Sequence, residues 1–84
     1  MKKIVRILES DDFLNLSIES RALYLYMRAI ADIEEDDYIT NPYGLADIMR
    51  VSRDCVNTLI NCGFIDKLEH GIKVNYVLSF EYED

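Results

Sequence analysis

Two short helical segments joined by a turn of about three residues, with a β-hairpin directly after the second, predict an α+β domain of the winged helix-turn-helix class. The two helices are expected at 43–49 and from Ser52 to about Cys62, and the hairpin strands at 64–68 and 72–78. A third main helix precedes them. The sheet is expected to be small and antiparallel, with the hairpin as its wing. At 84 residues the chain is expected to form one domain, residues 1–84, with an acidic tail at 79–84.

The first elements are predicted from capping residues and apolar spacing. A short strand or basic arm is expected at 3–8, and one helical turn after Ser10 that tucks under the core. Ser17 then caps a long helix from Ile18 to about Ile33. Its core face is predicted at helical spacing to be Leu23, Tyr26, Met27, Ile30 and Ile33. Its outer stripe is predicted to be Arg21, Arg28 and Asp32, and Ala22 and Ala29 are small enough for a neighbouring backbone to approach.

The middle of the chain carries clear start and stop signals. A brief strand is expected at 38–40, and Asn41 followed by Pro42 starts the next helix. Ser52 is expected to cap the last helix, and Gly63 to end it in a left-handed conformation. The core face of that helix is predicted to be Val56, Leu59 and Ile60. Cys55 and Cys62, seven residues apart, are expected to act as small apolar fillers.

The composition disfavours several functional classes. The only histidine, His70, falls at the predicted hairpin tip, and with two cysteines it does not make a four-ligand zinc site. Neither a nucleophile–base pair nor a glycine-rich phosphate loop is present, so we expect no enzyme and no cofactor. No apolar run is long enough for a membrane span. With only two cysteines, a cytoplasmic location in a bacterial host cell is expected.

The net charge of −7 disfavours a protein that binds nucleic acid by neutralising many phosphates. However, the acidic excess is confined to two short segments, and residues 38–78 contain four bases and four acids. Weak, salt-sensitive DNA binding is therefore a workable hypothesis. It would use the last helix, its start and the wing, where asparagine can pair with an adenine edge and bases can contact phosphates. The candidate nucleic-acid-binding residues are Arg50, Arg53, Asn57, Asn61, Lys67 and Lys73.

A second hypothesis comes from the acidic segments. A small acidic inhibitor or adaptor could bind a host protein and mask its nucleic-acid-binding surface, as phage inhibitors of replication or of CRISPR nucleases do. Six tyrosines are many for so small a chain and also suit a protein interface. A homodimer is left open. The candidate protein-binding residues are Asp32, Glu34, Glu35, Asp36 and Asp37.

Several short motifs between residues 9 and 74 resemble the N-terminal domain of phage replisome organisers, which is related to DnaD-like winged-helix replication proteins. The first is "SDDFLNL" from Ser10, followed by "ALY" at 22–24. The others are "MRAIADIEEDDYI" at 27–39, Asn41 with Pro42, and "CGFI" at 62–65. The resemblance implies a winged helix that binds origin DNA and helps to load a helicase. Carried over to this chain, the DNA-contacting positions would be Arg53, Asn57, Asn61, Lys67 and Lys73.

Overall fold

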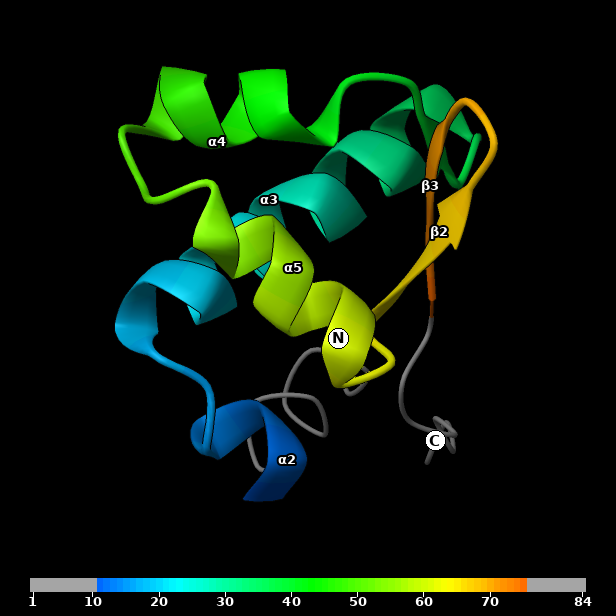
Figure 1. Cartoon of the computed structure of the whole chain (residues 1–84). Helices are drawn as coiled ribbons and strands as arrows, with labels where there is room; N and C mark the ends of the chain where they lie inside the picture. Colours follow the sequence, from blue (N-terminus) through cyan, green and yellow to red (C-terminus); the bar gives the residue numbers. More distant parts are fainter. Residues whose placement is uncertain (1–10, 76–84) are drawn as a thin grey trace, which may run out of the picture.

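The computed structural model describes residues 11–75 of the chain. Within that part, four helices and a three-stranded antiparallel sheet form an α+β arrangement (Figure 1), which confirms that the chain mixes helices with a small antiparallel sheet as predicted. The elements in chain order are α2 (Asp11–Leu14), α3 (Ile18–Glu34), β1 (Tyr38–Ile39), α4 (Pro42–Met49), α5 (Asp54–Asn61), β2 (Ile65–Leu68) and β3 (Gly71–Val74). The predicted strand at 3–8, the end of the second hairpin strand beyond residue 75 and the acidic tail at 79–84 lie outside the described residues. No helix among residues 11–75 combines the length and the apolar composition that crossing a bilayer requires.

The helix boundaries follow local capping chemistry. The Ser17 hydroxyl accepts a hydrogen bond from the Ser20 amide at 3.1 Å and starts α3, as predicted. Asn41 caps α4 in the same way, with its side-chain oxygen 3.0 Å from the Gly44 amide and proline at the first helical position. The last helix, α5, begins at Asp54, one residue later than a cap at Ser52 predicts, and Arg53 takes the cap position. The Ser52 hydroxyl still accepts from the Asp54 amide at 3.2 Å. The helix ends before Gly63, which has a φ of +82° and takes the predicted left-handed conformation.

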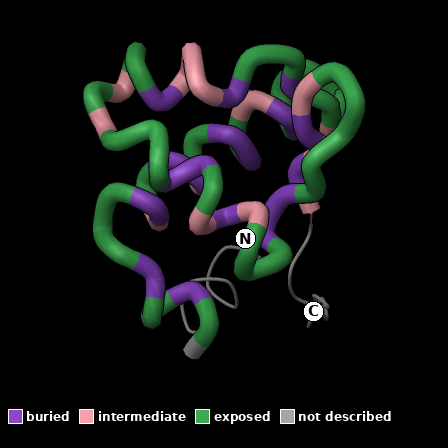
Figure 2. Tube along the Cα trace, in the orientation of Figure 1, coloured by how far each residue is buried: buried purple, intermediate pink, exposed green. Residues whose placement is uncertain are grey.

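The long helix α3 packs against α4, α5, β1 and β3, and its buried positions face them (Figure 2). The predicted core face of α3 is wrong at two positions, because Tyr26 is 40% exposed and Ile33 is 79% exposed. Arg28, predicted on the outer stripe, is instead 6% exposed. Both sides of this helix are apolar, so hydrophobic spacing alone cannot select the buried one. The buried residues are Ser20, Leu23, Tyr24, Met27, Arg28 and Ala31.

An aromatic cluster explains which side of α3 is buried. The Tyr24 ring lies 5.1 Å from the Phe64 ring and 6.4 Å from the Phe13 ring, centroid to centroid, in edge-on arrangements. Phe13 comes from the single turn α2, which therefore packs under the core as predicted. The Tyr24 hydroxyl also donates a hydrogen bond to the Asn75 carbonyl, so it joins α3 to the end of the sheet. Together these contacts rotate α3 so that Tyr24, and not Tyr26, enters the core.

The strands lie in the order β1-β3-β2, so the β2–β3 hairpin, which we call the wing, adds its second strand to β1. Ile72 of β3 is opposite Ile39 of β1 and Lys67 of β2, and Val74 is opposite Ile65. The hairpin turn needs Gly71, which has a φ of +121°; a Cβ there would lie 2.2 Å from the Ile39 carbonyl oxygen. The inner side of the sheet is made of Ile39, Ile65, Ile72 and Val74.

The two cysteines differ in environment. Cys55 is buried on α5 and fills core space as predicted, whereas Cys62 is exposed, so the prediction of a filler is wrong there. The reason is that α5 ends at Asn61, and Cys62 belongs to the turn before Gly63 and not to the packed helix face.

Candidate nucleic-acid interface

Three of the predicted site residues meet on one side of the molecule. Asn57 and Asn61 are exposed, one turn apart on α5, and Lys67 extends from β2 toward them. They surround an open hollow of about 350 Å³, which we call the Tyr43 hollow. Its lining consists of Tyr43, Asn57, Ile60, Asn61 and Lys67. A helix face of amides beside one strand-borne lysine can offer hydrogen bonds to base edges and a cation to a phosphate.

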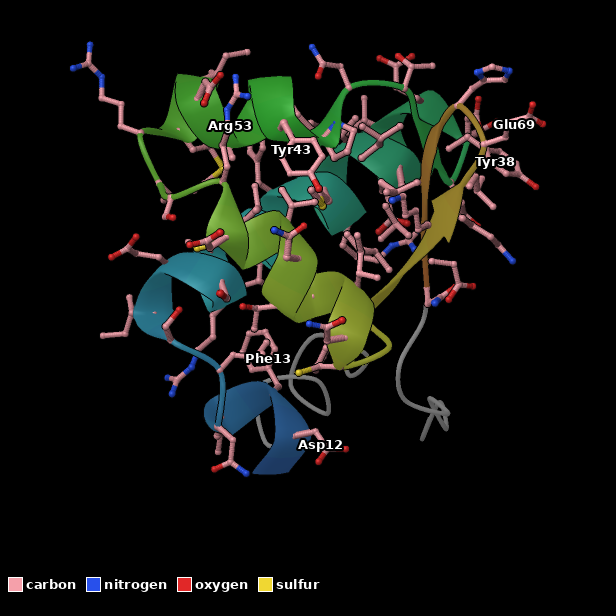
Figure 3. All side chains as sticks on the ribbon, in the orientation of Figure 1. Asp12, Phe13, Tyr38, Tyr43, Arg53 and Glu69 are labelled. Atoms are coloured by element: carbon pink, nitrogen blue, oxygen red, sulfur yellow. The ribbon has the colours of Figure 1, made fainter. Side chains whose placement is uncertain are left out.

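Tyr43 is the functional residue that sequence reasoning missed. Its ring extends from the first turn of α4 toward α5 (Figure 3), and its hydroxyl donates to Asn57 Oδ1 at 2.7 Å. The bond occupies the Asn57 oxygen and leaves the amide Nδ2 to donate outward. No spacing rule pairs positions 14 apart on different helices. The only signal was the unusual number of tyrosines.

The Tyr43 hollow continues toward the wing. A second hollow of about 200 Å³ shares Tyr43, Ile60 and Lys67 with it and reaches the hairpin turn at Glu69. Lys67 thus stands where the two hollows meet. Among the residues that line the two hollows, Lys67 is the one cation and Glu69 is the one acid.

Lys73 lies on the other face of the sheet. Directly paired residues of antiparallel strands point to the same face, and Lys67 is opposite buried Ile72. Lys73, one residue further along β3, is opposite Asp66 and Tyr38 and so shares their outer face. The structure therefore separates Lys73 from the Tyr43 hollow, although the sequence grouped it with Lys67.

The two arginines lie at the junction of α4 and α5, where Arg50 ends α4 and Arg53 immediately precedes α5. Arg53 is labelled in Figure 3. Arg53 Nε and Nη2 donate to the two carboxylate oxygens of Asp47, at 3.0 and 2.6 Å. These hydrogen bonds lower the pKa of the Asp47 carboxyl below its ordinary value and raise that of the Arg53 guanidinium. Arg50 ends α4 in the left-handed conformation, with a φ of +60°, and is exposed. Arg53 is thus already engaged by a carboxylate, and neither arginine is among the residues that line the Tyr43 hollow.

The candidate protein-binding segment at 32–37 is held largely by contacts within the chain. Arg28 Nη2 donates to Asp32 at 3.0 Å and to Asp37 at 2.7 Å, and its Nη1 donates to the Val74 carbonyl at 3.3 Å. The Asp36 carboxylate accepts from the Tyr38 amide at 2.9 Å. Three of the five acids are therefore engaged within the chain: Asp32 inside α3, Asp37 between α3 and the segment before β1, and Asp36 at the start of β1. Within residues 11–75, Glu34 and Glu35 are exposed and make no ion pair.

A further hollow of about 420 Å³ lies between α2 and the end of α5, lined partly by Asp12, Thr58 and Cys62. No predicted site residue borders it, and Asp12 is its charged member. Among the described residues, no three His, Cys, Asp or Glu side chains gather as a metal site would require. Compared with protein-family models, curated proteins and solved structures, the chain matches none.

Proposed function

We propose that this chain is a winged helix-turn-helix module that binds nucleic acid weakly, with α5 as the recognition helix and the β2–β3 hairpin as the wing. The order α3, β1, α4, α5, β2, β3 supports the assignment, since α4 and α5 are joined by a short turn and the hairpin follows directly. In support, β2 of the hairpin contacts α5, and Lys67 of β2 lines a hollow together with Asn57 and Asn61 of α5.

The observation that carries the proposal is the gathering of Asn57, Asn61 and Lys67 around the Tyr43 hollow. The residues come from a helix and a strand that the sequence separates, and they present amide donors and a cation on one exposed surface. The hydrogen bond from Tyr43 orients Asn57, which lowers the entropy cost of using its amide.

The expected affinity is modest. Only Lys67 brings a cation to the hollow, while Arg53 is paired with Asp47 and Lys73 faces away. A surface that brings one cation to the phosphates has a small salt slope, on the order of one released ion, so its affinity is low and falls only modestly with added salt. The module would then act beside a larger partner in replication or regulation of a mobile element. The resemblance to replisome organisers stays a prediction that points the same way.

The inhibitor hypothesis has less support from the geometry. Asp32 and Asp37 would have to leave Arg28 to bind a partner's cations, and this would disturb the join between α3 and the sheet. Glu34 and Glu35 alone make a small acidic surface. Nucleic-acid binding is therefore the function that we propose.

Fluorescence anisotropy with a labelled duplex and a labelled single strand tests the proposal, at about 50 mM and about 200 mM salt. Binding at the lower salt that weakens at the higher supports it, and absence of binding at the lower salt overturns it. The site is tested by Lys67→Glu, with Lys73→Glu as the matched control. The two variants have the same net charge, and both substitutions lie in the β2–β3 hairpin. Positions 67 and 73 are, however, on opposite faces of the sheet. Loss of affinity in Lys67→Glu should be at least about tenfold greater than in Lys73→Glu; equal losses would remove the hollow as the site.

A further inference from the structure

The outward side of α3 is apolar along its whole length. Ile18 and Ile33 are each 79% exposed, and Tyr26 is 40% exposed. Ala22 and Ala29 between them are also exposed, and Leu25 is half-buried. At 3.6 residues per turn these six residues fall within an arc of about 100°, opposite the buried side that contacts α5. We call them the α3 stripe.

The α3 stripe is symmetric about its midpoint, so its residue types occur in nearly the same order from either end of the helix. Ile18 and Ile33 are equally far from the midpoint between residues 25 and 26, and so are Ala22 and Ala29. Leu25 and Tyr26 flank the midpoint. If a second α3 is laid antiparallel on the first, each isoleucine meets an isoleucine and each alanine an alanine. Such self-complementarity is what a two-fold interface needs, because residue i must contact j while j contacts i. The alanines also let the two helix axes approach closely.

The charged residues beside the stripe are held within their own chain. Arg21 donates to the backbone carbonyls of Leu14 and Leu16, and Asp32 accepts from Arg28 at 3.0 Å. The self-complementary apolar residues therefore carry the pairing.

We propose that two copies of this chain associate through the α3 stripe as an antiparallel, two-fold dimer. The stripe is about 25 Å long and one helix face wide, which is less than the roughly 800 Å² per partner of a standard interface. The dimer is therefore weak and forms only at high protein concentration. Because α5 packs against the opposite side of α3, the dimer leaves both Tyr43 hollows exposed, at its two ends. The inference does not depend on nucleic-acid binding.

Sedimentation equilibrium from about 1 µM to about 1 mM protein tests the dimer. The average mass should rise from 9.8 kDa toward twice that value. Ile33→Glu should weaken association by at least about tenfold, since it places two charges in the interface. Ile48→Glu is the matched control, because Ile48 is 70% exposed on α4, away from the stripe. Circular dichroism confirms that both variants fold. A wild-type chain that stays monomeric throughout, or equal effects of the two variants, would overturn the proposal.

The register is tested separately by disulfide formation between single-cysteine variants in a Cys62→Ser background, which removes the exposed native thiol. In the antiparallel dimer, position 33 of one copy meets position 18 of the other, so an equal mixture of Ile18→Cys and Ile33→Cys chains should cross-link on oxidation. Ile33→Cys alone should not cross-link, because its two thiols would lie about 22 Å apart along the helix axis. Ready cross-linking of Ile33→Cys alone would overturn the antiparallel register.

Discussion

The guanidinium of Arg53, at the start of α5, forms two parallel hydrogen bonds with both carboxylate oxygens of Asp47 on α4. The pair ties α4 to α5 beside the proposed interface. Both side chains are more than half exposed, so the pair adds little to folding stability, and its main consequence is electrostatic. The neighbouring carboxylate of Asp47 neutralises the charge of Arg53.

Release of Arg53 should strengthen nucleic-acid binding. Asp47→Asn removes the competing charge, so at low salt the affinity should rise several-fold and the salt slope should increase by about one released ion. Anisotropy titrations at a series of salt concentrations measure both quantities. The double variant Asp47→Asn with Arg53→Ala should lose the gain. If Asp47→Asn alone leaves the affinity unchanged, Arg53 lies outside the contact surface.

The same pair has a defined pH dependence. The folded-state pKa of Asp47 is lowered, so its contribution to stability is present above the unfolded-state pKa, about 4, and is lost as the pH falls through the lower folded-state value. An NMR titration of the Asp47 side-chain carboxyl should give a midpoint below that of an ordinary aspartate. In Arg53→Ala the midpoint should return upward. If the titration midpoint of Asp47 is the same in Arg53→Ala as in the wild-type chain, the pair does not persist in solution.

Arg28 should matter more for stability than any other charged residue described. It is buried, it contacts Asp32, Asp37 and the Val74 carbonyl, and it joins α3 to β3. Arg28→Met keeps the length of the side chain but loses these hydrogen bonds, and should cost about 2–3 kcal/mol of unfolding free energy in urea. Asp37→Ala should cost more than Asp32→Ala, since Asp37 is closer to Arg28 and less exposed. The reverse order would show that the Asp37 contact is the weaker one.

Glu35 ends α3 in a left-handed conformation, with a φ of +55°, where a glycine would be unstrained. Glu35→Gly should therefore raise the free energy of unfolding by about 0.5–1 kcal/mol and the melting temperature by a few degrees. Glu34→Gly is the control, because Glu34 is still helical and glycine there should destabilise by up to about 1 kcal/mol. Thermal melts of the two variants should thus move in opposite directions.

The local elements could be predicted because each depends on near neighbours. Ser17, Asn41 and Gly63 start or end helices through bonds and backbone angles within four residues, and all three act as expected. Gly71 does the same for the wing, whose turn is tightened by the approach of β1. The sequence by itself therefore determined the α+β class, the element order and the helix face of Asn57 and Asn61.

Tertiary structure decided which side of α3 is buried and which candidate residues meet. Tyr24 and Tyr26 are both compatible with a helical apolar face, and only the contacts of Tyr24 with Phe13 and Phe64 place it in the core and leave Tyr26 outside. Lys67 and Lys73 looked equivalent until strand register put them on opposite faces. Arg28 and Tyr43 gained their roles from partners nine or more residues away. The spacing of apolar residues indicates the amphipathic faces of a single helix or strand. Only the packing between elements determines which residues each face contacts.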